Sequence, residues 1–431
     1  MGIMSRAADS RFAEVHLEAE DAPEALEVDS DRPFRILLAG DFSGRAWREI
    51  AWEPAAPIPI DRDNFEEVLA GMRITLDLDG VKLSFRELED FHPDRIYGRV
   101  GAAAVGERDV PTAGLLDQVL AEHYPEAAAV SASDADDLAG FVRKVTAGHT
   151  VQRESPAARQ READRQELAA KLLRRILHHP RMQTIEAAWR ALDLLVHELD
   201  TDGGLKLYVL DITLPELVRN RDAIQKQLRG KGPWALIAGN FTFGQSEVEA
   251  QALRQLGGMA KTLGAPFLAE ARLSGNEVSE RAWADLRSSE EAHWIGLAMP
   301  RFLLRLPYGK EGGSVESLPF EEMPRDEHNA YLWGNPAFAC AKLAGDSFLA
   351  EGWGLGRRLA RRIDGLPLHV YQEDGEAVAK PCAEILMTEQ DAENLLEAGF
   401  MPLVSIKNEP AAMLLRWQSI AEPAAALAGL R

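Results

Sequence analysis

Residues Met299–Gly309 read MPRFLLRLPYG, so two arginines lie four residues apart in an apolar run that prolines bracket. A guanidinium group is costly to bury unless carboxylates or backbone carbonyls satisfy its donors. We therefore expect acidic side chains from elsewhere in the chain to hold this segment in one conformation. Glu321 or Glu322 is the expected partner of Arg301 or Arg305. Breaking such a buried pair costs about 3–5 kcal/mol.

The length and charge of the chain limit the classes of function. A length of 431 residues suggests roughly two to three domains, and 46% hydrophobic residues are enough to build substantial cores. The 48 basic and 69 acidic residues give a formal net charge of -21. Phosphates would be repelled by this charge, so binding to nucleic acid or to anionic membranes is disfavoured.

Cysteine content and hydropathy predict the compartment. Cys340 and Cys382 are the only cysteines in the sequence, which is too few for a disulfide framework and typical of a reducing compartment. Residues Met1–Glu20 have mixed charge and no apolar segment, so we predict no signal peptide. No stretch approaches the roughly 20 apolar residues that a membrane-spanning helix needs. The sequence therefore predicts a cytoplasmic protein without membrane insertion.

The first hundred residues have the pattern of a small α/β unit. The compact apolar run Arg35–Ala39 predicts a strand that is closed by turn-forming residues. Asp61 or Asp63 is expected to cap a short helix through Leu69, since a glutamate follows Asp63 by three residues. The alternating segment Ile74–Phe85 contains an Asp-Gly pair and predicts a β-hairpin.

Composition divides the chain into three parts. Residues 1–110 form the N-terminal unit, and residues 111–165 are predicted to be a linker rich in alanine, aspartate and serine. Two modest helices are expected in the linker, around Leu115–His123 and Asp137–Thr146. Residues 166–431 form the larger and more regularly patterned body.

The body is predicted to be an α/β domain with a mixed central sheet and flanking helices, and an α+β arrangement is the alternative. Apolar residues recur at helical spacing over Met182–Leu199. Ser246 and Glu249 form a capping-box pattern that opens a helix to about Leu263. The strand candidates are Leu205–Ile212, Trp234–Phe241, Pro266–Ala271, His293–Met299, Ala383–Thr388 and Pro402–Ile406.

Two glycine-containing segments could suggest phosphate binding. Gly352–Arg358 combines glycines with arginines, but its glycine spacing differs from the dinucleotide fingerprint and a helix end precedes it. A tight turn with close backbone packing fits this segment better. Ala39–Gly44 follows a strand but lacks the Gly-Lys-Ser/Thr ending of a phosphate loop. We interpret it as a strand-to-loop turn.

The remaining titratable groups give weak signals for chemistry. His178 and His179 are neighbours and would point to different faces of a helix, so they are expected at a helix C-terminus and not on one metal ion. The pairs Glu290–Glu291 and Glu321–Glu322 could be acid/base dyads only if a cleft separated their pKa values. No Gly-x-Ser-x-Gly elbow occurs. We predict no catalytic, cofactor-binding or metal-binding residue.

Several segments of the body follow one another in a distinctive order. A His-Pro entry at His178–Gln183 precedes a Glu-x-x-Trp-Arg core at Glu186–Leu192. The segment Met299–Gly309 comes later. The other segments of this set are Ala265–Leu268, Trp283–Ser289, Gly296–Arg301, Phe320–Glu322, Leu332–Asn335, Ser347–Phe348 and Gly352–Trp353. In this order they resemble the large subunit of the type VI secretion contractile sheath (TssC, or VipB).

The N-terminal unit has a resemblance of its own. Its strand and turn at Pro33–Arg45, the segment Ile60–Phe65 and the Asp-Phe-x-Pro element within Phe85–Asp94 resemble the small subunit of the same sheath (TssB, or VipA). Together the two resemblances imply a natural fusion of a small-subunit part with a large-subunit body. A covalent link would fix their stoichiometry at one to one and raise their effective concentration.

The family implies a structural protein of a protein secretion apparatus, not an enzyme. Its expected partners are copies of itself or other sheath subunits, and an inner tube protein that the oligomer surrounds. The resemblance also implies contacts with the baseplate and with the unfoldase that disassembles the sheath. In the family the unfoldase-binding region corresponds to the linker at 111–165.

Two departures from the large-subunit pattern carry expectations. Residues Gly239–Phe243 read GNFTF where the family has a Gly-Asp-Tyr-x-Phe type segment, so the ionic contact of that aspartate is not expected here. The large subunit also continues beyond the point that corresponds to Arg431. We therefore expect the C-terminal arm, which exchanges strands between subunits in the family, to be absent.

Three functions are left open by the sequence. The first is a component of a type VI contractile sheath. The second is a non-polymerising, sheath-like cap, adaptor or assembly factor of the same apparatus. The third, of a different class, is an unrecognised nucleotide-using enzyme built on the glycine-rich turn.

Overall fold

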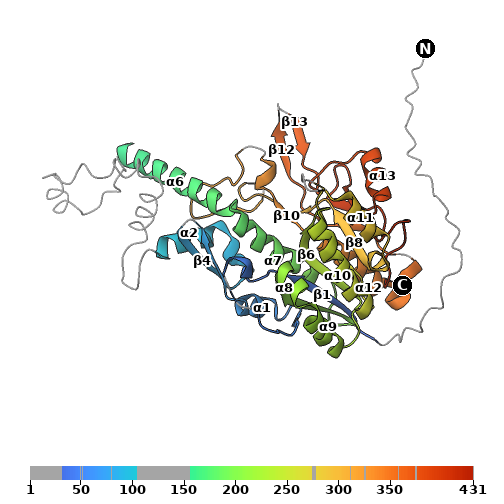
Figure 1. Ribbon diagram of the computed structural model, residues 1–431. Helices are drawn as coiled ribbons and strands as arrows, with labels where there is room; N and C mark the ends of the chain where they lie inside the picture. The colour runs from blue at the N-terminus through green and yellow to red at the C-terminus, as the bar shows by residue number, and fades with distance from the viewer. Residues whose placement is uncertain are drawn as a thin grey trace, which may run out of the picture.

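The computed structural model describes residues 32–103 and 156–430, with short gaps at 49, 51, 79, 274–277, 311, 325–326, 358 and 374–375. The two helices expected in the linker, around Leu115–His123 and Asp137–Thr146, lie outside the described residues. Within the described part, helices cover a large central sheet, and one long helix projects from the body (Figure 1).

Nine strands of the described residues form the central sheet, in the order β11-β15-β14-β8-β7-β6-β1-β5-β2. The neighbouring strands from β14 to β5 run parallel, whereas β15, β11 and β2 run antiparallel to their neighbours. The sheet is mixed, as the sequence predicted. Its strands are β1 Phe34–Gly40, β2 Ile58–Ile60, β5 Leu205–Asp211, β6 Leu236–Phe243, β7 Phe267–Ala271, β8 Ile295–Met299, β11 Arg362–Asp364, β14 Met401–Ser405 and β15 Ala411–Leu414.

Strand β1 shows how the two faces of the sheet are covered. Its side chains alternate between two cores: Ile36 and Leu38 belong to one, and Leu37 and Ala39 to the other. A strand that is buried on both faces reads as a continuous apolar run, which is the pattern of the sequence here. The first core includes α7 (Pro180–Glu198) and α12 (Pro336–Glu351), and the second includes α8 (Leu214–Arg219), α9 (Arg221–Gly230), α10 (Glu247–Leu263) and α11 (Glu280–Arg287).

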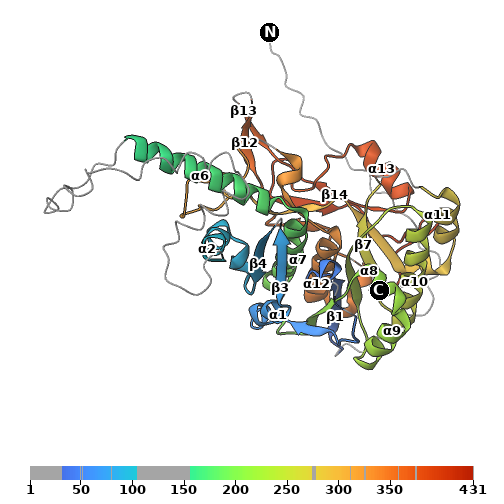
Figure 2. The ribbon, with the colours of Figure 1, turned by 60° about the vertical axis from the view of Figure 1, so that its left-hand side comes forward.

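Three two-stranded sheets and further helices surround this core (Figure 2). The hairpin of β3 and β4 lies beside α1 and α2, and the hairpin of β12 and β13 projects from the body. The small sheets are β3 Ile74–Leu78 with β4 Val81–Phe85, β9 Phe302–Arg305 with β10 Leu332–Gly334, and β12 Val370–Glu373 with β13 Glu376–Ala379. The other helices are α1 Phe65–Gly71, α2 Pro93–Ala103, α6 Pro156–Leu177 and α13 Glu389–Glu397, and the 3-10 helices are η1 Arg45–Trp47, η2 Leu88–Phe91, η3 Glu290–Trp294, η4 His328–Ala330 and η5 Gly352–Arg357.

The strongest local signals of the sequence are confirmed. The capping box of α10 forms as predicted: Glu249 N donates to Ser246 Oγ at 3.3 Å, and Ser246 N donates to the Glu249 carboxylate at 3.1 Å. The hairpin predicted from the Asp-Gly pair forms between β3 and β4. The amphipathic helix predicted over Met182–Leu199 is α7.

The segment Ala383–Thr388 is not a strand, so this prediction was wrong. Only Ala383 forms an isolated bridge, to Phe302. Thr388 instead begins a capping box with Asp391 and starts α13. The apolar residues of this segment do not enter a core as those of a strand would, because Ile385 and Leu386 are both exposed to solvent.

The start of α1 also differs from the prediction. Its N-cap is Asn64, and neither Asp61 nor Asp63 caps the helix with its side chain. The Asp61 carboxylate accepts hydrogen bonds from the backbone of Asp63 and Asn64 in the preceding turn. Glu66, which the capping box required, instead accepts the Leu88 N–H at 3.2 Å. A long-range partner therefore replaced the expected local one.

Strand β1 joins the N-terminal unit to the body. It lies between β5 and β6 and pairs with β5 in register from Phe34 opposite Leu205 to Gly40 opposite Asp211. Aromatic contacts extend the junction, since the Phe34 ring stacks on Phe348 with centroids 4.7 Å apart. The folded sheet therefore needs a strand from each part of the chain.

The helices on either side of residues 104–155 are in contact with each other. Helix α2 ends at Ala103 and packs against α6, which begins at Pro156 (Figure 2). A chain break in this region would leave the sheet pairing intact. As for membranes, no helix among the described residues is both long and apolar enough to cross a bilayer.

Splitting the chain tests the role of β1. Residues 151–431 expressed alone should fail to fold, because β5 and β6 lose the strand that pairs with both. Co-expression with a separate chain of residues 1–110 should restore a soluble complex. Solubility, co-purification and thermal melting by circular dichroism would measure this, with the intact chain as control. A cooperative melt of 151–431 alone at the temperature of the intact chain would contradict the prediction.

Candidate functional site

The buried centre of the structure is an ion-pair network around Arg305. Its guanidinium lies between two carboxylates: Nε donates to Glu186 Oε1 at 2.7 Å, and Nη1 donates to Glu322 Oε2 at 2.7 Å. Nη2 reaches both carboxylates, at 3.2 and 3.1 Å. The Arg305 side chain is only 10% exposed, and the two carboxylates are fully buried. This double bidentate geometry satisfies the charges that burial would otherwise make costly.

A second arginine and a tyrosine complete the network. Arg190, one helical turn after Glu186 on α7, donates to the same Oε1 at 2.7 Å and to the Tyr308 hydroxyl at 2.7 Å. The Tyr308 backbone N–H donates to Glu322 Oε2 at 2.7 Å, and the Arg305 guanidinium lies over the Tyr308 ring. The two arginines therefore balance the two carboxylates, and His178 Nε2 lies 3.5 Å from Glu322 Oε1 beside them.

Burial and charge act in opposite directions on these groups. Burial alone would raise the pKa of Glu322, but the Arg305 charge and several hydrogen bonds outweigh it and lower the pKa to about 2. Burial would likewise lower the pKa of Arg305, yet the charges of Glu186 and Glu322 raise it well above its usual value. Burial also raises the pKa of Tyr308 to about 12. The groups therefore stay fixed in one protonation state around neutral pH.

Arg301 has a different partner from the one predicted. Its Nε donates to Glu384 Oε2 at 2.8 Å, and Glu384 N donates back to the Arg301 carbonyl at 2.8 Å. The sequence left open whether Glu321 or Glu322 pairs with Arg301 or Arg305, and the pair that forms is Glu322 with Arg305. Glu321 contributes a backbone carbonyl, which accepts from Arg174 Nε at 2.7 Å. Neither Glu384 nor Glu186 was predicted from the sequence to pair with these arginines.

The N-terminal unit contacts the network directly. The His92 ring meets the Tyr308 ring edge-on, with centroids 4.8 Å apart. Two residues on, the Asp94 carboxylate accepts the backbone N–H groups of Glu316 and Ser317 at 3.1 and 2.8 Å. The Asp-Phe-His-Pro-Asp element of the N-terminal unit is thus bonded to the loop that follows the arginine segment.

The loop Ala39–Gly44 has its amides already bonded, unlike a phosphate-binding loop. The N–H groups of Phe42 and Ser43 donate to the Asp211 carboxylate at 2.9 and 3.1 Å. The next amide, of Arg45, donates to the Asp41 carboxylate at 2.7 Å. This arrangement fits the strand-to-loop turn that the sequence predicted.

The same loop lies where the strand order reverses, between β1 and β6. Doubly wound sheets bind their ligands beyond the carboxyl ends of the strands at such a point. In this structure Phe42 and Trp189 pack there: both are fully buried, and Trp189 Nε1 donates to the Phe42 carbonyl at 2.8 Å. Aromatic side chains therefore occupy space that a ligand would need.

The other sequence candidates also take structural positions. Helix α12 ends at Glu351, and Gly352 turns the chain with a φ of 62°. Trp353 then packs against Phe34 and Phe348 and donates to the Arg32 carbonyl at 2.7 Å. The glycine-rich segment is thus a turn, as predicted, but a Cβ added at Gly352 or Gly354 would meet no atom within 4 Å, so the expected close backbone packing is absent at these two glycines.

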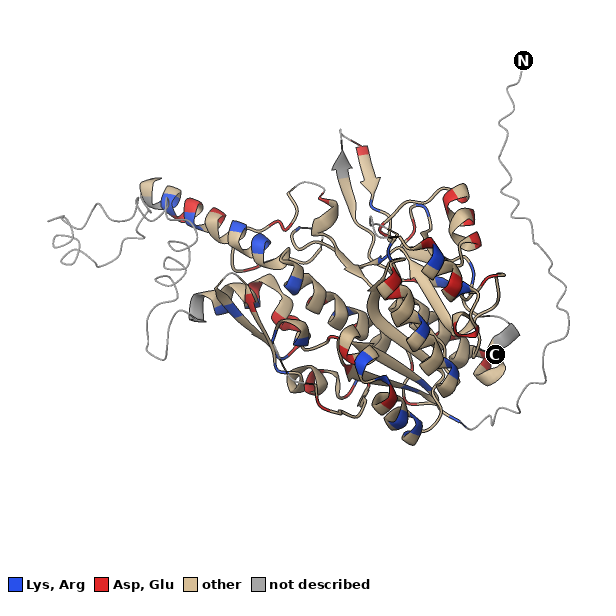
Figure 3. Cartoon of the chain, in the orientation of Figure 1, with Lys and Arg blue, Asp and Glu red and all other residues tan. Residues whose placement is uncertain are grey.

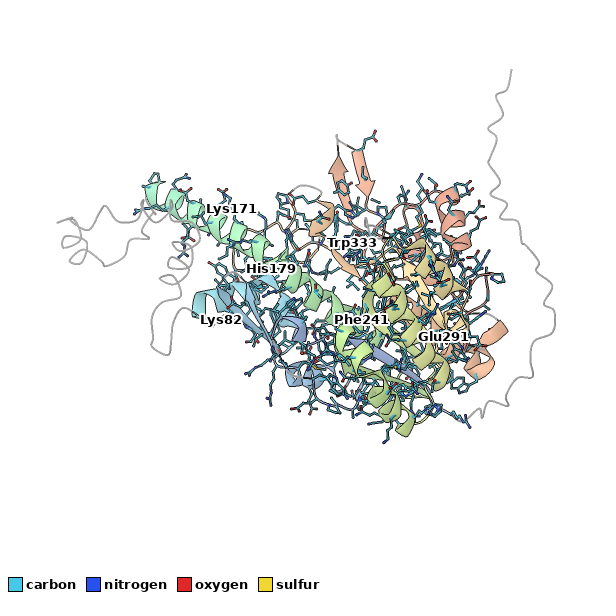
Figure 4. All side chains as sticks on the ribbon, viewed as in Figure 1. Lys82, Lys171, His179, Phe241, Glu291 and Trp333 are labelled. Carbon is cyan, nitrogen blue, oxygen red and sulfur yellow. The ribbon has the colours of Figure 1, made fainter. Side chains whose placement is uncertain are left out.

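The histidine pair lies between two helices, as the label of His179 in Figure 4 shows. His178 N donates to the Arg174 carbonyl at the end of α6, as predicted, but His179 is the N-cap of α7 and accepts from Arg181 N. Among residues 32–103 and 156–430, no group of three or more histidine, cysteine or acidic residues could hold a metal ion. Of the other carboxylate pair, Glu290 forms an exposed ion pair with Lys261.

Comparison with known proteins places these features in a family of contractile sheath proteins. The family described as "EvpB/VC_A0108, tail sheath N-terminal domain" (VipB) matches residues 163–231 and 274–421. The family described as "Type VI secretion system, VipA, VC_A0107 or Hcp2" matches residues 8–104. The chain belongs to the VipB tail sheath family and carries a VipA-type segment on its N-terminal side.

A relative from Pseudomonas aeruginosa supports this assignment. It is the "Type VI secretion system sheath protein TssC1", which is 32% identical over an alignment covering 58% of this chain. The chain spans 58% of the length of that relative. The resemblances to the large and small sheath subunits predicted from the sequence are thereby confirmed.

Removing the central cation of the network should destabilise the fold. Arg305→Met leaves Glu186 and Glu322 buried without their shared partner, so we expect the free energy of unfolding to fall by about 3–5 kcal/mol. The control is Arg362→Met, since Arg362 pairs with Asp364 and Glu409 at the exposed surface and its loss should change the stability much less than the loss of Arg305. Urea unfolding would measure both. Equal midpoints for the two variants would argue against the central role of Arg305.

The low pKa of Glu322 predicts a pH dependence. Its pKa is about 2 in the folded protein, against an ordinary value of 4.5, so between these values the unfolded chain binds more protons. The stability that Glu322 contributes is therefore present above pH 4.5 and is lost as the pH falls towards 2. We expect the difference in unfolding free energy between the native chain and Glu322→Gln to shrink over this interval. A difference that stays constant from about pH 6 to about pH 2 would show that Glu322 is not held ionised.

Proposed function

We propose that this protein is a structural subunit of a type VI secretion contractile sheath in which a small-subunit part and a large-subunit part share one polypeptide. It acts in the cytoplasm, associates with other sheath subunits and surrounds an inner tube. The baseplate and the disassembly unfoldase are further proposed partners, while nucleic acid is not. We also propose that residues 1–110, 111–165 and 166–431 correspond to the small-subunit part, a linker and the large-subunit body.

One observation carries this proposal. Strand β1, from the VipA-type segment, is the neighbour of β5, from the VipB-type segment, at the centre of a single sheet. The contacts of His92 and Asp94 join the same two segments at the Arg305 network. A subunit that transmits force needs its parts to move as a unit, and a shared sheet with a buried ion-pair network supplies that stiffness.

A non-catalytic role fits a structure in which side chains of the protein fill the place where an enzyme with a doubly wound sheet would bind its ligand. The place where a doubly wound sheet would hold a ligand contains Phe42 and Trp189, and the amides of the loop after β1 are bonded to Asp41 and Asp211. The pKa of the buried Glu322 carboxyl is lowered to about 2 by Arg305 and its hydrogen bonds, so this group is not poised for proton transfer near neutral pH. These features support a structural role over the nucleotide-using enzyme.

One observation favours the alternative of a non-polymerising cap, adaptor or assembly factor. Both edges of the central sheet are short: β2 has three residues and includes Pro59, and β11 has three residues and carries the charged pair Arg362 and Asp364. Short edges with proline or charges resist the addition of a further strand. Assembly through these two edges is therefore disfavoured.

Imaging of the purified protein separates the two functions. For a sheath subunit, negative-stain electron microscopy of the full chain should show rings or tubes of uniform diameter. The Arg305→Met variant should show fewer of them at raised temperature, because its body unfolds earlier. The Arg362→Met variant serves as the matched control. Particles that stay monomeric at every concentration would contradict the sheath role and favour the cap or adaptor.

A further inference from the structure

A groove of about 540 Å³ opens beside the β3–β4 hairpin, where the described surface is locally basic. Its lining includes Trp47, Arg48 and Arg181, the last from the first turn of α7. Lys82 lies on the exposed face of β4 and is labelled in Figure 4. The groove faces solvent on the outside of the N-terminal unit.

The walls of the groove are held in place by specific contacts. The Arg181 guanidinium lies over the Trp47 ring, 5.7 Å from its centroid. Arg48 Nη1 donates to the carbonyls of Ser43 and Arg73 at 3.2 and 2.9 Å. These bonds fix two cations beside an aromatic surface, which suits a ligand that carries both an apolar side chain and carboxylates.

One carboxylate, that of Asp77, also lines the groove and reduces its positive charge. Asp77 is the cross-strand neighbour of Lys82, and its Oδ1 accepts the N–H of Gly80 at 3.0 Å in the hairpin turn. Three cations against one carboxylate leave the groove positive on a chain with a net charge of -21. An anionic partner would be drawn to it by its local field.

The same chain carries a surface of the opposite character on α13. Glu389, Glu393 and Glu397 are spaced four residues apart, so they form one stripe on the helix, and all three are exposed (Figure 3). Just before the helix, Ile385 and Leu386 are exposed, Leu386 by 77%. This surface is complementary to the groove: its exposed leucine suits the aromatic ring, and its acidic stripe suits the cations.

We propose that the groove binds α13 of a second copy of this chain, with Leu386 against Trp47 and the acidic stripe against Arg48, Arg181 and Lys82. This inference deepens the proposed function, on which it rests, by naming a contact between subunits. The β3–β4 hairpin, which lines the groove, and α13 are well separated in both ribbon views (Figures 1 and 2). A contact between two different surfaces leaves one groove and one α13 unused on each dimer. The same contact can therefore repeat from copy to copy, as a ring or a tube requires.

Disulfide trapping between two variants tests the contact directly. The native cysteines are 1% and 0% exposed, so they do not react with added thiols at the surface. A mixture of Lys82→Cys and Glu393→Cys chains should form a disulfide-linked dimer, several-fold more than either variant alone. Replacing the first variant by Lys226→Cys, an exposed position on α9, is the matched control. A yield in the mixture no higher than in this control overturns the proposal.

Charge reversal separates this contact from the proposed function. Lys82→Glu or Glu393→Lys should weaken self-association about tenfold or more in sedimentation velocity, and the double variant should restore it. Glu198→Lys, an exposed acid at the end of α7, should have no effect. If the native chain forms rings or tubes and both single variants do so equally well, the groove contact is wrong and the sheath role stands. If the native chain stays monomeric, both proposals fail.

Discussion

The pairing of Arg305 with Glu186 and Glu322 is the constraint on which the rest of the structure depends. It joins β9 and the loop before β10 to the helix α7, whose Glu186 lies 119 residues from Arg305 in the sequence. Once Arg305 is buried, these elements can only be arranged so that both carboxylates reach it, because an unpaired buried charge costs several kcal/mol. Tyr308 and His92 then transmit this arrangement to the N-terminal unit.

The central sheet imposes a second constraint that agrees with the first. The alternating side chains of β1 enter both cores, so neither core is complete without a strand from the N-terminal unit. The loop after β1 is bonded to Asp211 at the end of β5, and Phe42 packs on Trp189 of α7. Helix α7 therefore contributes to both the ion-pair network and the aromatic packing, which explains why its sequence pattern is so regular.

The sequence predicted the elements whose signals are local. The run of β1, the hairpin turn and the capping box of α10 were found because each depends on residues within one turn or strand. Glu322 was one of two neighbouring glutamates that the sequence offered as partners of Arg301 or Arg305. Glu186 lies 119 residues from Arg305, and Glu384 lies 83 residues from Arg301, so only the fold brings them together. A signal for Glu186 did exist: it is a carboxylate on the buried stripe of an amphipathic helix, where an unpaired charge would not be tolerated.

The position of β1 has a consequence for how the chain is made. Its partner strand β5 is synthesised about 170 residues later, which at roughly 5–20 residues per second is a delay of about ten to thirty seconds on the ribosome. During that time the apolar strand has no partner to pair with. Two separate subunits would have to meet by diffusion after each is released from its ribosome. In this chain β1 stays attached to the ribosome that is still synthesising β5, so the two strands are close to each other as soon as β5 emerges.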